Sequence, residues 1–257
     1  MTAPDSRGPV LPPLSPNGWL RWEVASRLLP QSTDRRLDLL EVGCGQGGFG
    51  ARLAQRYRYV GVEPDAISCA TAQQRGAAVG DGEVRHGDLS AVKPDETFDL
   101  VVAFEVIEHI EDDAGALAEW AAHLRPGGLL LLSTPAWQKR FGAADEMVGH
   151  FRRYDPPVLR DRLTGAGLTD VEVVHFGEPL GYLLEAGRNY AGRKKLAAGA
   201  TAESMAERSD ASGRTLQPST SWTATAARLG TLPFRAVQRA FPGVGPGLVA
   251  RGRKPTA

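Results

Sequence analysis

Four residues carry side chains that can transfer protons or bind metal ions: Glu105, Glu108, His109 and His150. The first three are spaced so that a helix would place them on one face. They follow a predicted buried strand, and ligands bind just beyond the strand ends of open α/β sheets. A histidine with a pKa near neutrality can accept a proton, so His109 and His150 are candidate catalytic bases, with Glu108 beside them.

The same four residues can also be interpreted as a metal site. Two carboxylates and two imidazoles suit Mn, Fe or Zn at least as well as Mg, which prefers oxygen ligands. A bound divalent ion would acidify a hydroxyl group. In a third interpretation Glu108 and His109 only cap and position a helix, so the sequence alone assigns no residue as a metal ligand.

A glycine cluster around residue 45 is predicted to form a small-molecule site, because a buried strand precedes it and a helix follows. Glycine lets the backbone turn through positive φ and approach a ligand closely, and the N-terminus of a helix favours an anionic group. Gly43, Gly45 and Gly48 fit the dinucleotide fingerprint G-x-G-x-x-G. Glu41, Gly43, Gly45 and Gly47 fit acid-x-G-x-G-x-G, a pattern that binds a different adenosine cofactor.

An acid follows the next predicted strand. Glu63 lies 20 residues beyond Gly43, where a carboxylate can accept hydrogen bonds from both hydroxyls of a ribose. An acid that opens the next helix is the alternative, but Asp65 already fills that role. We therefore expect Glu63 to bind ribose.

Predicted strands and helices alternate along most of the chain. The apolar patterns predict strands at 37–42, 57–62, 83–89, 98–104, 129–132, 171–176 and 244–251. They predict helices from Asn17 to Pro30, after residue 49, around 67–70, over 117–124, 156–166 and 180–190, and around 232–241. This alternation is typical of a parallel sheet with helices on both faces. Residues 192–225 show no apolar period, which indicates a mobile insertion or lid.

Five motifs occur in a defined order: 41–47, Glu63, Asp88, 98–109 and 124–128. In this order and spacing the chain resembles the class I S-adenosylmethionine-dependent methyltransferases over residues 37 to about 176. The resemblance implies an α/β fold, Rossmann-like and doubly wound, with a mostly parallel seven-stranded sheet and an antiparallel last strand. The run that contains His150, before the helix at 156, also resembles many members of this family.

The resemblance also implies roles for individual residues. The glycine turn would support the methionine part of S-adenosyl-L-methionine, Glu63 would bind the ribose, and Asp88 would reach the adenine amino group. The full set of expected cofactor-binding residues is Glu41, Gly43, Cys44, Gly45, Gly47, Glu63, Asp88, Leu89 and Phe104. The metal interpretation is similar to the metal-using ubiquinone-pathway O-methyltransferases and the small-RNA 2′-O-methyltransferases. Arg152 and Arg153 are either solvated or able to bind a substrate carboxylate or phosphate.

We expect a Pro-rich extension at 1–16 and one methyltransferase domain at 17–257. By resemblance, an insertion at about 178–243 would separate the two strands of the closing hairpin. Lys and Arg total 30, as do Asp and Glu, so no overall field attracts nucleic acid or an anionic membrane. Two cysteines favour a reducing compartment. With no signal-peptide pattern or apolar run long enough to span a membrane, we expect a cytoplasmic, soluble protein.

The expected function is transfer of a methyl group from S-adenosylmethionine to a small molecule, preferentially at oxygen. A nicotinamide-dependent oxidoreductase that uses Gly43, Gly45 and Gly48 is one alternative. A non-catalytic protein that binds the cofactor is another. An RNA methyltransferase is disfavoured, because it would bind RNA in a salt-dependent manner and the charge of this chain is balanced. The acceptor and the oligomeric state do not follow from the sequence.

Overall fold

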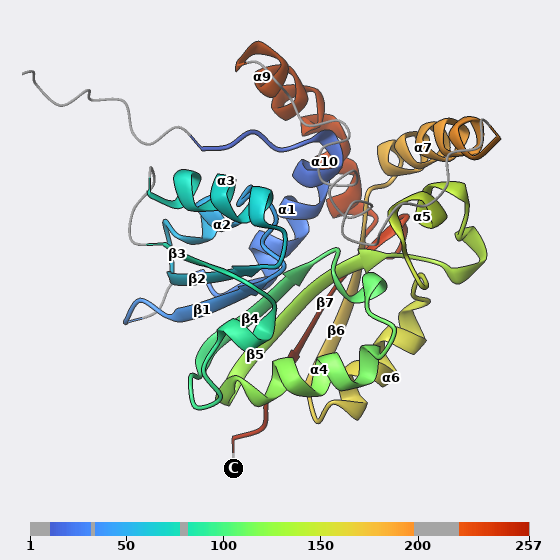
Figure 1. Cartoon of the computed structure of the whole chain (residues 1–257). Coiled ribbons are helices and arrows are strands. Elements are labelled where there is room, and N and C mark those ends of the chain that lie inside the picture. The colour runs from blue at the N-terminus through green and yellow to red at the C-terminus, as the bar shows by residue number, and fades with distance from the viewer. Residues whose placement is uncertain (1–10, 32–33, 78–81, 198–220, 257) are drawn as a thin grey trace, which may run out of the picture.

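The computed structural model describes residues 11–31, 34–77, 82–197 and 221–256. Within them, seven strands form one sheet in the order β3-β2-β1-β4-β5-β7-β6, shown in Figure 1. Neighbouring strands are parallel except for β7, which is antiparallel to both β5 and β6. The strands are β1 (Asp38–Val42), β2 (Arg58–Glu63), β3 (Glu83–His86), β4 (Phe98–Phe104), β5 (Leu124–Pro135), β6 (Thr169–Phe176) and β7 (Gly247–Arg253). This confirms the predicted fold class.

Helices cover both faces of the sheet (Figure 1). The α-helices are α1 (Pro16–Leu28), α2 (Gly50–Leu53), α3 (Ala66–Ala77), α4 (Asp113–Ala122), α5 (Ala143–Val148), α6 (Pro156–Gly165), α7 (Leu180–Ala197), α9 (Ser221–Gly230) and α10 (Leu232–Ala240). Short 3₁₀ helices lie at η1 (Leu89–Ala91), η2 (Ile107–His109) and η3 (Gln138–Arg140). None of the helices in the described ranges has both the length and the hydropathy to cross a bilayer.

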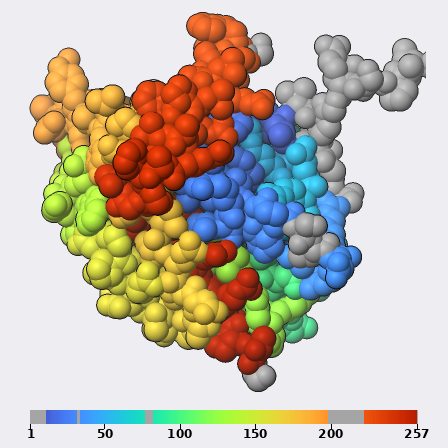
Figure 2. All heavy atoms as spheres, turned by 180° about the vertical axis from the view of Figure 1, so that it is seen from behind, coloured from blue at the N-terminus to red at the C-terminus, as the bar shows by residue number. Residues whose placement is uncertain are grey.

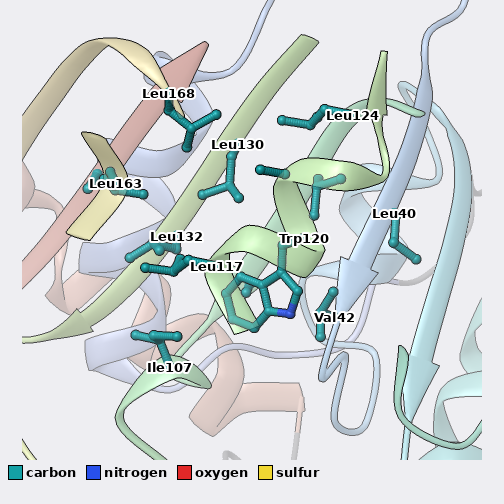
Figure 3. Close-up of a cluster of buried hydrophobic side chains, with 14 of the residues drawn as sticks. Leu40, Val42, Ile107, Leu117, Trp120, Leu124, Leu130, Leu132, Leu163 and Leu168 are labelled. Atoms are coloured by element: carbon teal, nitrogen blue, oxygen red, sulfur yellow. The ribbon is translucent and has the colours of Figure 1, made fainter. Parts of the chain in front are cut away.

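The central strands are apolar throughout because both of their faces are buried. In β5, Leu130 and Leu132 join a cluster under α4 and α6, whereas Leu129 and Leu131 join a second cluster with α1 and α2. Figure 3 shows the first cluster, in which Trp120 of α4 lies among side chains of the sheet. Burying each leucine stabilises the fold by roughly 1.5–3 kcal/mol. The core therefore fixes the strand ends, where the site is built.

Helix α1 begins earlier than expected. Ser15, not Asn17, is its N-cap: the Ser15 hydroxyl oxygen accepts a hydrogen bond from the Gly18 amide at 3.1 Å, and Pro16 takes the first helical position. Proline fits that position because its missing N–H would have no helical partner there. Leu14, within the predicted Pro-rich extension, is buried against the domain. The first ten residues of that extension lie outside the described residues.

The sequence between β6 and β7 contains α7, α9 and α10. Both ends of the stretch at 192–225 are helical, since α7 continues to Ala197 and α9 begins at Ser221. The rest of that stretch is outside the described residues. Helix α10 lies beside α1, as the view from behind shows (Figure 2), and Gln238 of α10 donates a hydrogen bond to the Leu20 carbonyl at 2.9 Å. The chain between the hairpin strands is thus anchored to the first helix.

Candidate active site

The carboxyl ends of the parallel strands and the loops after them line one cavity of about 1260 Å³. Helices α1, α4, α5 and α7 contribute further wall residues. This is the edge at which ligands bind in open α/β sheets. Most of the residues expected to bind the cofactor line this cavity, as do His109 and His150; Gly47 and Glu108 do not.

The glycine turn after β1 has the backbone that the sequence predicts. Gly43, Gly45 and Gly47 have φ values of +66°, +54° and +73°, which residues with a Cβ rarely adopt. A Cβ on Gly43 would lie 2.7 Å from Val106, whereas a Cβ on Gly45 would meet nothing within 4 Å. Gly45 therefore faces open space. Helix α2 has only 4 residues, so the helix dipole expected at this turn is small.

Glu63 points at the glycine turn. Its Oε2 accepts a hydrogen bond from the Gly45 amide at 2.7 Å, and its Oε1 accepts one from the Asp65 amide at 3.0 Å. Asp65 in turn accepts a hydrogen bond from the Ser68 amide at 2.7 Å, at the start of α3. The two acids therefore have the separate positions that the sequence predicts, with Glu63 at the strand end and Asp65 at the helix.

Asp88 lines the same cavity, after β3. Its side chain accepts a hydrogen bond from the Ser90 amide at 2.9 Å and caps η1. Hydrogen bonds from the Ser90 side chain and backbone lower the pKa of Asp88. The cavity wall therefore carries an ionised, exposed carboxylate at this position. Cys44, Leu89 and Phe104 are buried beside it and supply apolar surface.

Glu41 lies beneath the turn and is 2% exposed. Burial raises its pKa to about 8, although the hydrogen bond from the Tyr59 hydroxyl, at 2.6 Å, opposes the shift. Glu41 is therefore mostly protonated at neutral pH. Tyr59 belongs to none of the motifs in the sequence, and its role was not anticipated. A signal for it is the pair Gly50 and Gly61, since a Cβ on either would lie 2.4 Å from the Tyr59 hydroxyl.

A second group of side chains gathers beyond β4. One ligand atom from each of Glu108, His109 and His150 lies within 4.8 Å of the others. The His109 and His150 rings meet edge to face with centroids 4.6 Å apart, and His150 Nε2 is 3.9 Å from Glu108 Oε1. The fold therefore brings His150 next to Glu108 and His109, which lie far from it in the sequence.

Burial controls the protonation of this group. It raises the pKa of the fully buried Glu108 well above its usual range, and nearby Glu105 adds to the shift. It also lowers the pKa of His109 to about 4, so this imidazole is neutral at neutral pH. The Thr134 hydroxyl donates a hydrogen bond to Glu108 Oε2 at 3.2 Å, while Glu108 Oε1 is buried with no hydrogen-bond partner among the described residues.

Glu105 does not share a helical face with Glu108 and His109, so that prediction is wrong. Its φ is +56°, and η2 spans only the 3 residues from Ile107 to His109. The chain turns sharply where β4 ends, which breaks the helical spacing. The Glu105 carboxylate instead lies 2.8 Å from the Arg21 guanidinium and accepts a hydrogen bond from Ser133 at 3.1 Å. Glu105 is not among the three side chains that converge as possible metal ligands.

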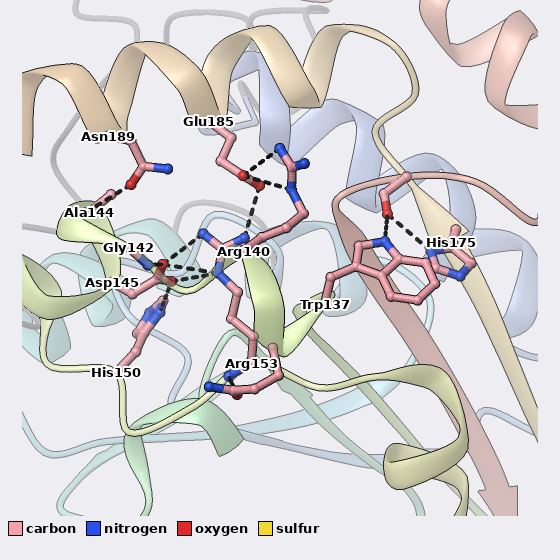
Figure 4. Close-up of polar contacts among 12 residues, drawn as sticks. Trp137, Arg140, Gly142, Ala144, Asp145, His150, Arg153, His175, Glu185 and Asn189 are labelled. Carbon is pink, nitrogen blue, oxygen red and sulfur yellow. Dashed lines mark hydrogen bonds and ion pairs between the residues drawn. The ribbon is translucent and has the colours of Figure 1, made fainter.

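Asp145 orients His150 and was not anticipated. His150 Nδ1 lies 2.8 Å from Asp145 Oδ1, and Arg153 also donates to this carboxylate (Figure 4). Burial opposes ionisation, but the hydrogen bonds from His150 and Arg153 lower the pKa of Asp145 to about 2. An ionised carboxylate can only accept hydrogen bonds, so Nδ1 carries the proton and Nε2 is the acceptor when His150 is neutral.

Both arginines of the run after His150 are held in ion pairs within the protein. Arg153 is 5% exposed and pairs with Asp145 at 2.8 Å and with Glu185 of α7 at 2.9 Å. Arg152 pairs with Asp113 at 2.8 Å. Both guanidiniums hold parts of the structure together.

The fold and the site define the class I methyltransferase architecture. The sequence model of the family described as methyltransferase domain matches residues 19–173, and the chain belongs to this family of S-adenosylmethionine-dependent proteins. This match favours a methyltransferase over the alternative of a nicotinamide-dependent oxidoreductase. Strands β1 to β5 and the glycine turn fall within the matched residues.

Individual relatives agree with this assignment. The chain is 40% identical over 124 residues to a probable S-adenosylmethionine-dependent methyltransferase of Mycolicibacterium smegmatis, covering 46% of each chain. It is 36% identical over 107 residues to a ubiquinone biosynthesis O-methyltransferase of Bradyrhizobium sp., covering 38% of this chain and 40% of that one. The chain thus spans about half the length of the curated relatives it matches.

Solved structures share the fold. A possible histamine N-methyltransferase from Thermotoga maritima superposes with a TM-score of 0.55 at 21% identity, covering 92% of this chain and 88% of that one. At this identity the likeness concerns the arrangement of the elements only.

Proposed function

We propose that the chain transfers the methyl group of S-adenosylmethionine to a hydroxyl of a small-molecule acceptor. The cavity of about 1260 Å³ exceeds the roughly 300–1,000 Å³ of a typical single-ligand pocket, so it has room for the cofactor and an acceptor side by side. A small molecule is favoured over RNA because acidic and basic residues balance at 30 each.

The cofactor would lie over the glycine turn. Gly43, Gly45 and Gly47 would support its methionine part, since the backbone at Gly45 faces open space. Glu63 would take the ribose hydroxyls, because a carboxylate held at a strand end accepts hydrogen bonds from both. Asp88 would meet the adenine amino group across the same cavity. Glu41, Cys44, Leu89 and Phe104 complete the walls. Bound there, the cofactor supplies an electrophilic methyl group.

The His150–Asp145 hydrogen bond at 2.8 Å is the observation that carries the proposal for oxygen. Methyl transfer to a hydroxyl leaves a proton to be removed from that oxygen. Asp145 fixes the proton of His150 on Nδ1, so Nε2 can take the acceptor proton as the new carbon–oxygen bond forms. Neutral His109, which lines the cavity next to His150, would hold the acceptor beside Nε2. The name of the Bradyrhizobium relative, an O-methyltransferase, agrees with this chemistry.

A second mode of catalysis is favoured by one observation. Glu108 Oε1 is buried without a partner among the described residues, beside His109 and His150. This donor set of one carboxylate and two imidazoles suits Mn, Fe or Zn. A divalent ion held there would acidify an acceptor hydroxyl. Glu108, His109 and His150 would then be the ligands of the ion. The acceptor would lie beside His150, as it does in the first mode.

The direct test is incubation of the purified protein with S-adenosylmethionine labelled in its methyl group and a set of phenols, hydroxy acids and amines. We expect labelled methyl ethers or O-methyl products and equimolar S-adenosylhomocysteine. Labelled N-methyl products would contradict transfer to oxygen. Binding of the cofactor without release of S-adenosylhomocysteine in any mixture would indicate a non-catalytic protein.

A further inference from the structure

Three residues along one side of helix α7 hold it over the acceptor end of the cavity, the end at which His150 lies. Glu185 pairs with Arg153 at 2.9 Å and with Arg140 at 2.8 Å. The Asn189 side chain accepts a hydrogen bond from the Ala144 amide at 3.0 Å. Gly192 lets the helix approach α5, since a Cβ there would lie 3.1 Å from the Ala143 backbone. Figure 4 shows Glu185 and Asn189 projecting from α7 toward these partners.

Two cations of the same helix line the cavity: Arg188 and Lys195. They are seven residues apart in the sequence, so they lie on one side of the helix, two turns from each other. Because the contacts with α5 hold the helix in place, they also fix the backbone positions of Arg188 and Lys195. The cavity therefore has a cationic wall along α7.

The other charged groups around this wall are already paired. The Arg21 guanidinium lies 2.8 Å from Glu105, and Arg153 and Arg140 together balance Asp145 and Glu185. In the part of the chain that the structure describes, Arg188 and Lys195 have neither a hydrogen bond nor an ion pair. The wall thus carries positive charge that the protein itself does not compensate.

Arg188 is the stronger binding group of the two. It lies near the Arg21–Glu105 pair and near Glu185 and Arg153, and its side chain is exposed and lines the cavity. A guanidinium stays protonated at neutral pH, and its planar donors match a carboxylate or a phosphate bidentately. An anionic group on a bound ligand would give Arg188 the counterion that it lacks.

We propose that Arg188, together with Lys195 two turns further along α7, binds an anionic group of the methyl acceptor. The acceptor is then a hydroxylated acid that bears a carboxylate or a phosphate. This inference rests on the proposed function for the hydroxyl that is methylated. The anion would anchor the acceptor at α7 while its hydroxyl reaches His150. Specificity would then come from the charge at one end of the cavity and the base at the other.

The test compares matched acceptors and matched variants. The acceptors are 4-hydroxybenzoate, 4-hydroxyphenyl phosphate and the neutral 4-hydroxybenzamide, at saturating S-adenosylmethionine. The variants are Arg188→Gln, Arg188→Lys and Arg193→Gln, the last an exposed cation of α7 that does not line the cavity.

We expect the acids to be preferred over the amide, and the better acid identifies the anion. Arg188→Gln should raise KM for the acids by roughly 10- to 100-fold, as expected for loss of a charged hydrogen bond. Arg188→Lys should recover part of this, and Arg193→Gln should match the wild type.

A binding measurement separates this inference from the proposed function. Titration of benzoate and of inorganic phosphate into protein saturated with S-adenosylhomocysteine should show weaker anion binding for Arg188→Gln than for Arg193→Gln. This result is expected even if methylation turns out to occur at nitrogen. Equal binding by the two variants overturns the inference. So does a loss of S-adenosylhomocysteine affinity in Arg188→Gln, because Arg188 would then serve the cofactor carboxylate.

Discussion

His150 Nδ1 and Asp145 Oδ1 lie 2.8 Å apart, and the same carboxylate is held by the buried Arg153. The imidazole that would accept the substrate proton is therefore positioned by an acid that is itself fixed in place. Such a partner fixes the tautomer and the orientation of the histidine ring.

Asp145→Asn should lower kcat by roughly 10- to 100-fold, because a neutral amide no longer supports the imidazolium that forms during proton transfer. The pH at which kcat reaches half its maximum should also shift, which a merely structural role would not cause. Steady-state rates across pH 5–9 measure both effects. Glu146→Gln, at an exposed neighbouring carboxylate, is the matched control and should leave the profile unchanged. An unchanged profile in Asp145→Asn would contradict the positioning role.

His150→Gln should lower kcat by roughly 10²- to 10⁴-fold, the usual contribution of a general base. The affinity for S-adenosylhomocysteine, measured by calorimetry, should stay within about twofold, because His150 lies at the acceptor end. A variant that loses turnover and cofactor affinity together would place His150 with the cofactor.

A chelator separates the two modes of catalysis. If His150 acts directly as the base, extensive dialysis against EDTA should leave kcat unchanged. If Glu108, His109 and His150 hold an ion, EDTA should abolish turnover and Mn, Fe or Zn should restore it. Glu108→Gln should then remove metal binding in a titration of the protein with Mn alone, and Glu105→Gln should not, since Glu105 is paired with Arg21.

Glu63→Gln should weaken S-adenosylhomocysteine binding by roughly 10- to 150-fold, the range for losing charged hydrogen bonds. Calorimetry measures this directly. Glu111→Gln, at an exposed carboxylate that does not line the cavity, is the control. Equal affinities in the two variants would show that the acid after β2 does not bind the cofactor.

Glu41 should make the stability of the ligand-free protein depend on pH. Burial raises its folded pKa from 4.5 to about 8, so its contribution is fully present below about pH 4.5 and is lost as the pH rises through 8. The loss amounts to at most roughly 5 kcal/mol at about 1.4 kcal/mol per pKa unit. In Glu41→Gln the fall in unfolding free energy between pH 5 and pH 8.5 should be smaller. Urea denaturation at several pH values measures it, and an unaltered slope would contradict the shifted pKa.

The glycine turn, Glu63 and the sheet were predictable because their signals are local. Strand, turn and helix follow one another within a few residues, and an acid at a strand end points where the strand points. Gly43, Gly45 and Gly47 confirm the prediction with positive φ values. Asp88 also lies in the expected cavity.

The acceptor end was harder to predict because it depends on long-range contacts. Spacing alone placed Glu105 on a helix, but the chain bends at the end of β4 and gives the residue a φ of +56°. Arg153 gave no local sign of its partners, since Glu185 comes from α7, beyond β6. Asp145 precedes His150 by five residues, and only the fold of α5 brings the two together.

The most direct measurement follows the methyl group itself. Wild-type protein and His150→Gln would each be incubated with methyl-labelled S-adenosylmethionine and 4-hydroxybenzoate, and the product would be characterised by mass spectrometry and NMR. We expect a labelled methyl ether from the wild type and a rate at least about 100-fold lower from the variant. Equal rates from both proteins, or label on an atom other than the hydroxyl oxygen, would contradict proton removal by His150.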